Sequence, residues 1–229
     1  SADQGPAGSN RMRILWFSAG VSSAVAAYVS KPDRMVYIDI EDQHPDSMRF
    51  LRDCERWLGR EIEIIKPELE SVEKCCLAAG FVRSPWGAAC TNRLKKRERR
   101  IWERENGDDH TYIWGLDANE RKRMLGIERA MPKNEHEFPL VGLGWDKGFI
   151  HGFLKDQGIQ RPAMYDMGYN NNNCIGCIKG GAGYWNKIRV DFPDVFAARA
   201  AMERVIGGHI LSDCFLDELD PEAGRHTKP

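Results

Sequence analysis

The feature that most constrains the fold is an apolar run that passes directly into small residues. Met12 to Phe17 is typical of a short buried strand, Ser18–Ser23 reads Ser-Ala-Gly-Val-Ser-Ser, and Ala24 to Val29 suits a helix. A strand that turns through small residues into a helix leaves backbone N–H groups and the positive end of the helix dipole for an anion. We expect Gly20 to allow the turn. Small residues also occur where a helix packs tightly on a sheet, so this segment alone leaves both interpretations open.

Further strands and helices alternate along the chain. Strands are predicted at 35–40, 61–65 and 111–114, and helices at 46–58, 94–104, 145–158 and 194–206. Segment 161–183 is typical of a loop. Strands separated by helices predict an α/β fold with a parallel, Rossmann-like sheet and right-handed crossovers.

The totals set the class of protein. The 229 residues carry 33 basic and 34 acidic side chains, so bulk charge does not indicate a nucleic-acid binder. No stretch approaches the roughly 20 apolar residues of a membrane span, so we expect no membrane partner. Residues 1–10 lack a signal-peptide core and are predicted to be a disordered tail or cloning remnant. We expect a nucleotide-binding domain over 11–169, with 170–229 forming a cysteine loop, helix and tail packed on it.

The seven cysteines favour reduced thiols over a disulfide framework, which suggests a cytoplasmic protein. Cys174 and Cys177 form a Cys-x-x-Cys pair, which supplies half of a metal or cluster site, and Cys90 is the candidate third ligand. Cationic neighbours and a helix start are expected to lower the pKa of Cys90. A redox thiol pair is the alternative for Cys174 and Cys177. The remaining cysteines are predicted to be core residues or small buried hydrophobes, namely Cys54, Cys75, Cys76 and Cys214.

Segment 94–104 is strongly basic. Its cations are Lys95, Lys96, Arg97, Arg99, Arg100 and Arg104. Such a helix suits the phosphates of a nucleic acid, and a solvated helix face is an equal alternative.

Several segments, in order, resemble the PP-loop superfamily (adenine nucleotide alpha-hydrolase-like), in its phosphoadenylyl-sulfate (PAPS) reductase branch. Ser18–Ser23 is similar to the family's Ser-Gly-Gly-x-Asp-Ser, and Tyr37–Asp46 to its second strand and Asp-Thr-Gly-x-x-x-Pro-Glu continuation. Gly115–Arg123 is similar to its Gly-x-Arg-x-x-Glu-Ser-x-x-Arg segment. The Pro-Leu, Trp and Gly-Tyr markers follow at 138–169.

The resemblance implies a PP-loop fold and a set of site residues. The implied nucleotide-binding residues are Ser18, Gly20, Ser22, Ser23, Asp39, Gly115, Glu120, Arg121 and Arg123. Arg93, Lys95 and Lys96 are the implied catalytic residues, because they could stabilise charge that develops at phosphate. Asp39 would lie at a strand end beside the nucleotide, with a helix cap or turn aspartate as its alternative.

The end of the chain departs from the reductases. They finish with Glu-Cys-Gly-Leu-His, whose cysteine attacks sulfur, whereas 222–226 here reads Glu-Ala-Gly-Arg-His and Ala223 has no thiol. The resemblance therefore implies sulfur transfer or substrate adenylation. The alternatives are a sulfonucleotide reductase with a displaced nucleophile and a non-catalytic nucleotide-binding or nucleic-acid-binding module.

The implied cofactors are a 4Fe-4S cluster on Cys90, Cys174 and Cys177, with zinc as the alternative, ATP or a sulfonucleotide, and Mg²⁺ if ATP is cleaved. The candidate partners, besides the adenine nucleotide, are a tRNA or DNA substrate, a sulfur or electron donor protein, and a second copy of the chain in a homodimer.

Overall fold

A computed structural model describes residues 11–85 and 87–224. The chain forms two compact units, each assembled from separate stretches of sequence. The first contains residues 11–37, 48–64 and 102–162, and the second contains 38–47, 65–85, 87–101 and 163–224. The predicted tail at 1–10 and the last residues of the chain, which include His226, lie outside the described residues.

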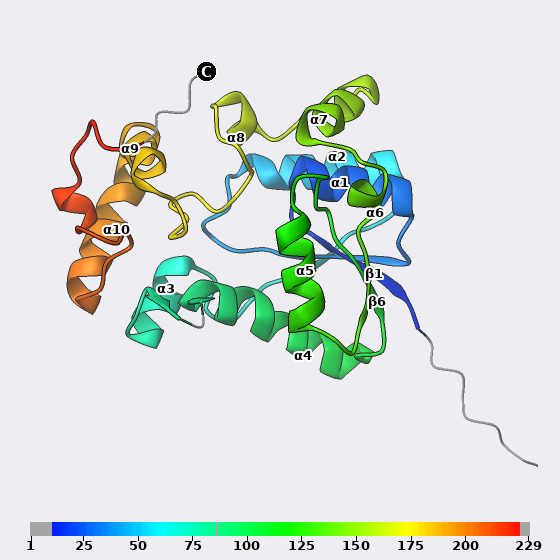
Figure 1. Ribbon diagram of the computed structural model, residues 1–229, viewed down its shortest axis with the longest axis horizontal. Helices are drawn as coiled ribbons and strands as arrows, with labels where there is room; N and C mark the ends of the chain where they lie inside the picture. The colour runs from blue at the N-terminus through cyan, green and yellow to red at the C-terminus, as the bar shows by residue number, and fades with distance from the viewer. Residues whose placement is uncertain (1–10, 86, 225–229) are drawn as a thin grey trace, which may run out of the picture. The chain divides into compact units, whose positions relative to one another are not determined.

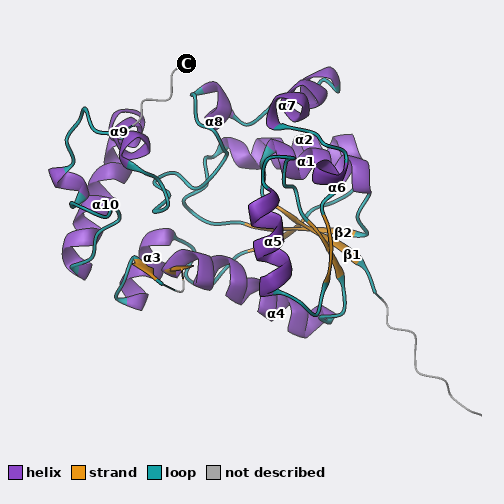
Figure 2. Cartoon of the chain, viewed as in Figure 1, coloured by secondary structure: helices purple, strands orange, loops and turns teal. Residues whose placement is uncertain are grey.

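The first unit is built on a sheet of five strands in the order β3-β2-β1-β6-β7. The strands are β1 (Arg13–Phe17), β2 (Arg34–Ile38), β3 (Glu63–Ile65), β6 (Thr111–Ile113) and β7 (Glu135–Glu137). The pairs β1–β2, β1–β6 and β6–β7 are parallel, with Phe17 opposite Tyr37 and Leu15 opposite Ile113. The predicted parallel α/β fold is therefore confirmed (Figures 1 and 2).

Helices cover the sheet because successive strand residues face opposite sides. Phe17 lies 6.4 Å from Phe50, between ring centroids, on the face that carries α1 (Val21–Ser30) and α2 (Asp46–Leu58). The helices α6 (Pro139–Gly142) and α7 (Lys147–Asp156) pack against α1 (Figure 1). Trp16 faces the other side and meets Trp102, near the end of α4 (Arg97–Asn106), at 5.7 Å.

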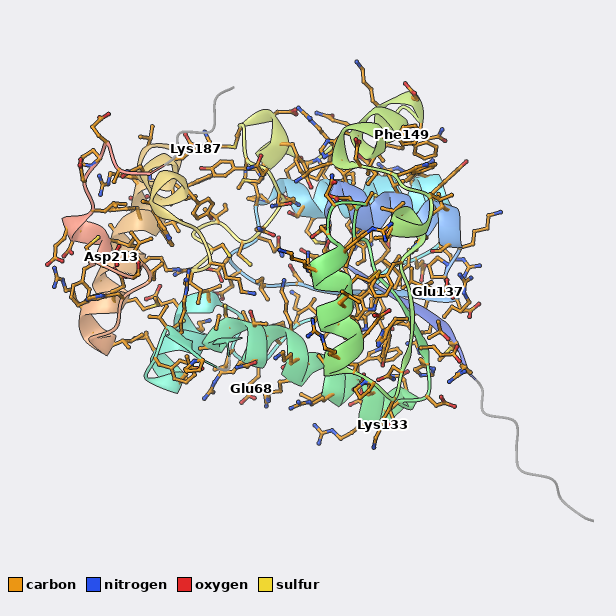
Figure 3. The ribbon with its side chains drawn as sticks, in the orientation of Figure 1. Glu68, Lys133, Glu137, Phe149, Lys187 and Asp213 are labelled. Atoms are coloured by element: carbon orange, nitrogen blue, oxygen red, sulfur yellow. The ribbon has the colours of Figure 1, made fainter. Side chains whose placement is uncertain are left out.

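The edge strand β7 is polar and was not predicted. Glu137, labelled in Figure 3, pairs with Arg13 at 2.6 Å, and Glu135 pairs with Arg11 at the same distance. Glu-His-Glu gives no apolar alternation, so strand pairing rather than burial places this segment in the sheet. After β6, α5 (Arg121–Ala130) has no buried residue, which explains why no apolar face marks it in the sequence.

The second unit is mostly helical. Its elements are α3 (Val72–Ala79), the hairpin β4–β5 (Arg83–Ser84 and Gly87–Ala88), the π-helical turn η1 (Thr91–Lys96), α8 (Ala163–Asp166), α9 (Ala182–Asp191), α10 (Pro193–Ile206) and η2 (Leu216–Glu218). Cys75 and Cys76 are fully buried in its core beside Trp185, as predicted. Cys54 is likewise fully buried, in α2, whereas Cys214 is half-buried. The segment predicted to be a loop, 161–183, contains α8.

No helix among the described residues is long and apolar enough to cross a membrane.

Candidate functional site

The phosphate loop is the turn between β1 and α1, residues 18–23. Its one left-handed residue is Ala19, at φ 54°, whereas Gly20 is extended at φ −102° and ψ 159°. The expectation that Gly20 supplies the turn conformation is therefore wrong, because an extended backbone suits any residue. Ala19 is fully buried, so the surrounding structure holds it in a conformation that normally favours glycine.

The serine hydroxyls of the loop differ in role. The Ser23 hydroxyl donates to Gly20 O at 2.8 Å and accepts from the backbone N–H of Ser18 at 3.2 Å. The Ser23 hydroxyl therefore closes the loop on itself, and its proton is already used within the loop. The amides of Ser22 and Ser23, in the first turn of α1, have no carbonyl partner within the helix. No acidic residue lies in that turn, so its electrostatics suit an anion.

Gly115 joins the segment after β6 to this loop. A Cβ added at Gly115 would lie 2.6 Å from Ser23 Cα and 2.9 Å from Ser22 C, so the backbones are in direct contact and only glycine fits. The strand order reverses between β1 and β6, where nucleotides bind in open α/β sheets. The structure thus brings together Ser18, Gly20, Ser22, Ser23 and Gly115, as the sequence predicts for one phosphate site.

The rest of that segment is organised by its own side chains. Glu120 accepts from the backbone N–H of Asp117 at 3.1 Å and pairs with Arg123 at 2.8 Å. Arg121 is exposed at the start of α5. The Glu120 carboxylate therefore binds the loop before α5 and pairs with Arg123, while the two arginines supply the positive charge of the segment.

Sequence reasoning did not single out Lys147 or Asp117. Lys147, the first residue of α7, is half-buried, and burial lowers the pKa of its ammonium group while Asp117 and Glu120 partly offset this. Asp117 is 8% exposed and its carboxylate accepts from the amide of Asn119 at 2.8 Å. A lysine with a lowered pKa beside two carboxylates is a signal that only the three-dimensional structure provides.

The other predicted site residues belong to the second unit. Asp39 is half-buried directly after β2, and its amide donates to Ile65 O at 2.9 Å. Arg93, Lys95 and Lys96 lie in η1, which continues into α4, so the predicted basic helix starts earlier than expected. Arg93 donates to Ala78 O at 3.4 Å, whereas Lys95 and Lys96 are exposed. A π-helical turn is rare and is frequent at functional sites.

The Cys174–Cys177 turn is anchored by its backbone. The amide of Ile175 donates to Asp42 O at 2.7 Å. Gly176 has φ 69°, and an added Cβ there would lie 2.6 Å from Val195 Cγ1, so a side chain would be strained and crowded. The Tyr184 hydroxyl accepts from the amide of Cys177 at 2.9 Å and donates to Cys174 O at 3.2 Å.

A buried ion pair supports that turn from beneath. Arg199 is 3% exposed and contacts the carboxylate of Asp42, which is 9% exposed, while the other Asp42 oxygen accepts from the amide of Val72 at 2.6 Å. A second guanidinium nitrogen of Arg199 lies 3.3 Å from Glu73. These partners are far apart in sequence, and no motif marks them.

Burial controls the thiols. It raises the pKa of Cys90, and Cys177 nearby adds to the rise, while Lys179 and Lys95 act against it. The expectation of a lowered Cys90 pKa is therefore wrong, because desolvation outweighs the cationic neighbours. Burial also raises the pKa of Cys174 to about 12. All seven cysteines are free thiols.

The positions of the thiols bear on metal binding. Among residues 11–85 and 87–224, no three His, Cys, Asp or Glu side chains are grouped to hold a metal ion, so Cys90, Cys174 and Cys177 do not form a ready ligand set. The chemistry around the Cys174–Cys177 turn nevertheless suits a metal ion or cluster. Trp185 Nε1 and Arg199 Nε are buried donors without a partner among the described residues, and both side chains flank Gly176 of the turn. Buried N–H donors and soft thiols suit a sulfur-ligated metal or cluster.

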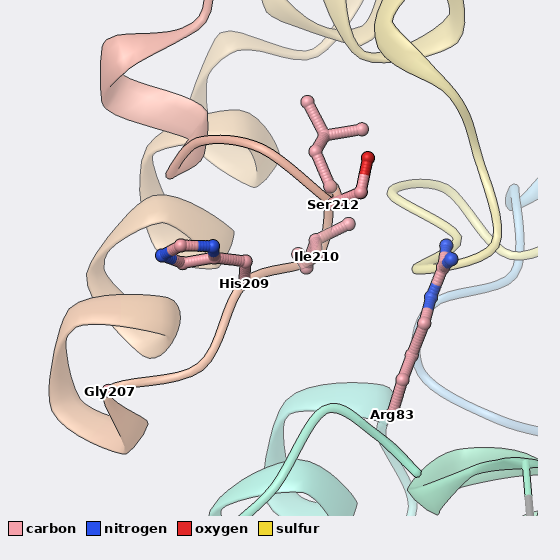
Figure 4. Close-up of a pocket in the computed structure, with 6 residues that line it drawn as sticks. Arg83, Gly207, His209, Ile210 and Ser212 are labelled. Atoms are coloured by element: carbon pink, nitrogen blue, oxygen red, sulfur yellow. The ribbon is translucent and has the colours of Figure 1, made fainter. Parts of the chain in front are cut away.

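The second unit also has an open hollow of about 430 Å³, lined by Arg83, Gly207, His209, Ile210, Leu211 and Ser212 (Figure 4). Arg83 Nε donates to Ile178 O at 2.8 Å. The hollow therefore borders the segment that leaves the Cys174–Cys177 turn, but none of the predicted site residues lines it.

Three comparisons with known proteins were made, of which one matched a family over most of the chain. The sequence model of the phosphoadenosine phosphosulfate reductase domain matches residues 14–180. A phosphoadenylyl-sulfate (PAPS) reductase from Candida auris, in a phosphate complex, is 16% identical with a TM-score of 0.48, covering 69% of this chain and 78% of that one. A predicted subunit of tRNA methyltransferase from Methanocaldococcus jannaschii is 16% identical with a TM-score of 0.37, covering 64% and 87%. A comparison with curated protein sequences found no match.

Proposed function

The chain belongs to the phosphoadenosine phosphosulfate reductase domain family, and from this we propose that it binds an adenine nucleotide at the phosphate loop and transforms it enzymatically. The observation that carries the proposal is the contact between Gly115 and the Ser22–Ser23 backbone. It joins two loops at the strand ends where the sheet order reverses, which is where such folds bind phosphates. ATP and sulfonucleotides share the phosphate that this loop would hold.

We propose a reaction in which positioning and charge do the catalytic work. The loop amides hold phosphate, and Arg121 and Arg123 bind a second phosphate or sulfate through their planar donors. Cleavage of ATP between its α- and β-phosphates transfers AMP to an oxygen of the acceptor and releases pyrophosphate, with Mg²⁺ bound to the triphosphate. A sulfur or amine nucleophile then displaces AMP. Arg93, Lys95 and Lys96 are assigned to the developing charge, and Asp39 to the nucleotide.

We assign the sulfur chemistry to Cys90, Cys174 and Cys177. A 4Fe-4S cluster held there would supply a site for sulfur, and zinc would supply a structural or Lewis-acid site. Because their pKa values are raised, the Cys90 and Cys174 thiols are protonated at neutral pH, and a bound metal would displace those protons. The exposed Lys95, which lowers the pKa of both thiols, would offset part of the thiolate charge.

A sulfonucleotide reductase with a displaced nucleophile is the second candidate. The resemblance of 222–226 to the reductase ending would place Ala223 at the position of the reductase cysteine, and the Ala223 carbonyl accepts from Asn186 Nδ2 at 2.8 Å. This pinned alanine cannot attack sulfur, so reduction would need another thiol. Cys214, half-buried in the same tail segment, is the nearest cysteine in sequence.

The acceptor class follows from the basic segment. Part of it is neutralised, since Arg97 pairs with Glu68 at 2.7 Å, while Lys95 and Lys96 are exposed. We propose tRNA or DNA as the acceptor, because these cations suit a phosphate backbone. The other proposed partners are a protein that donates sulfur or electrons and a second copy of the chain, which would form a homodimer. A non-catalytic binding module would use the same surface without turnover.

Titration calorimetry with ATP, AMP and adenosine 5′-phosphosulfate tests the proposal, with product analysis on the same samples. Arg121→Ala should weaken binding by about tenfold, the loss typical of a charge-assisted hydrogen bond. Lys122→Ala, the exposed neighbour on α5, should leave affinity unchanged. Release of AMP and pyrophosphate would support adenylation, sulfite release with a thiol donor would support reduction, and binding without turnover would support a binding module. No binding of any nucleotide would overturn the proposal.

A further inference from the structure

The Cys174–Cys177 turn is closed through a side chain. In a simple four-residue turn the last N–H donates directly to the first carbonyl. Here the Tyr184 hydroxyl stands between those groups, because Cys177 N–H donates to it at 2.9 Å and it donates to Cys174 O at 3.2 Å. One phenol therefore bonds the backbones of both cysteines.

Tyr184 is itself held firmly. Its ring lies 5.6 Å from Trp185 and 5.9 Å from Tyr169, both in edge contacts. A Cβ at Gly180 would overlap the Tyr184 ring, so the ring can pack against the backbone at position 180 only because that residue is glycine. A phenol hydroxyl can donate one hydrogen bond and accept another, which is what the contacts with Cys174 O and the Cys177 amide require.

The other anchors act elsewhere on the turn. Ile175 N–H is bound by Asp42 O, and Gly176 packs on Val195. These contacts fix the middle of the turn, whereas the phenol spans its two ends. The separation of the two cysteine backbones therefore depends on Tyr184.

We propose that Tyr184 is the positioning residue of the Cys174–Cys177 pair, holding the turn open at the spacing its thiols need. This assignment rests on the proposed role of those thiols in sulfur or metal chemistry. Its hydroxyl does not react; it satisfies one amide and one carbonyl that would otherwise be left unpaired or would pair with each other and tighten the turn.

Site-resolved alkylation of the reduced, metal-free protein by iodoacetamide, followed by mass spectrometry across pH 7 to 10, tests this role. Tyr184→Phe should raise the rates at Cys174 and Cys177 by about tenfold, as expected when two hydrogen bonds to the turn are lost. The matched control is Tyr169→Phe, which removes from the neighbouring ring a hydroxyl that donates to Asp191 at 2.8 Å. It should leave both rates unchanged.

The buried cysteines report on general loosening. Cys54, Cys75 and Cys76 are fully buried, so their rates should not change in Tyr184→Phe. Gly180→Ala, which displaces the ring while keeping the hydroxyl, should reproduce the selective rise. Unchanged rates at Cys174 and Cys177, or an equal rise at the buried cysteines, would overturn the assignment.

Zinc alone provides a separate readout. If the wild-type protein binds Zn²⁺, Tyr184→Phe should weaken binding by about 10- to 100-fold, as loss of a supporting hydrogen bond does at metal sites. An unchanged zinc affinity would contradict the positioning role. If the wild-type protein binds neither zinc nor iron, the metal part of the proposed function fails, and the alkylation rates still decide the role of Tyr184.

Discussion

The phosphate loop and the Cys174–Cys177 turn both come shortly before a helix, but they are held in different ways. The phosphate loop is held by neighbours in sequence and by one backbone contact, from Gly115. The cysteine turn is held by the Tyr184 side chain, seven residues after Cys177, and by Asp42 and Arg199 from segments distant in sequence. The phosphate loop should therefore be most sensitive to added volume at Gly115, whereas the cysteine turn should depend on side chains from outside the turn.

The largest effect is expected at the ion pair beneath the cysteine turn. Arg199→Met leaves Asp42 buried without its charged partner, which should lower the free energy of unfolding by about 3–5 kcal/mol. Urea denaturation measures this. Arg204→Met, in the same helix, breaks an exposed pair with Asp217 and should have a much smaller effect. Equal effects of the two substitutions would contradict the proposed dependence on buried side chains.

Added volume should break the phosphate loop instead. Gly115→Ala places a methyl group 2.6 Å from Ser23 Cα, so the backbone must shift, and we expect a loss of about 1–3 kcal/mol together with loss of ATP binding. Gly126→Ala is the control, because its position in α5 has open space around it and alanine favours the helix. Denaturation and calorimetry measure both properties. Full ATP affinity in Gly115→Ala would show that ATP binding does not depend on the contact between Gly115 and the Ser22–Ser23 backbone.

The buried thiol of Cys76 provides a pH test in the core beside the cysteine turn. Burial raises its pKa to about 12, so it stays protonated in the folded protein while the unfolded chain ionises near its ordinary value. Its contribution to stability is thus complete below the unfolded pKa and is lost as pH rises toward the folded value. At pH 10 the loss should be about 1–2 kcal/mol.

Cys76→Ala should remove this loss. The unfolding free energies of wild-type and variant, measured by urea denaturation from pH 7 to 10, should run parallel below pH 8 and converge above it. Parallel curves throughout would show that the thiol ionises equally in both states.

The smallest effect is expected at Ala19. Its left-handed conformation is costly for alanine, but glycine gains chain entropy on unfolding, so Ala19→Gly should change stability by less than about 0.5 kcal/mol. Ala27→Gly, in the middle of α1, should cost about 1 kcal/mol because the helix loses a favourable residue. Thermal unfolding separates the two. A larger loss for Ala19→Gly would indicate that the alanine methyl group stabilises the loop.

The same contrast explains what the sequence could predict. The strands β1, β2 and β6, the helix α2 and the turn between β1 and α1 follow from patterns within a few residues of each other, and the structure contains these elements. Phosphate binding at that turn stays a prediction. The strand β7 is polar and gains its place by strand pairing, and the helix α5 has no buried residue, so no periodic apolar pattern marks either element.

Long-range contacts account for the rest. Asp42 and Arg199 are 157 residues apart, and their pairing depends on the completed fold. The sequence identified Cys90, Cys174 and Cys177 as candidate metal ligands, and the cations near Cys90 predicted a lowered pKa for its thiol. Burial raises that pKa instead, and a sequence does not reveal how deeply a thiol is buried. The left-handed residue was likewise assigned to Gly20, since residue type alone favours glycine over Ala19.

Hydrogen exchange with and without ATP tests the central claim most directly. ATP should slow exchange of the backbone amides at 19–23 and 115–120 by about tenfold or more, because the bound phosphates order the first turn of α1 and the loop after β6. The amides of α10 should be unaffected. Protection confined to other segments, with none at 19–23, would show that the nucleotide binds elsewhere and would contradict the assignment of the phosphate loop.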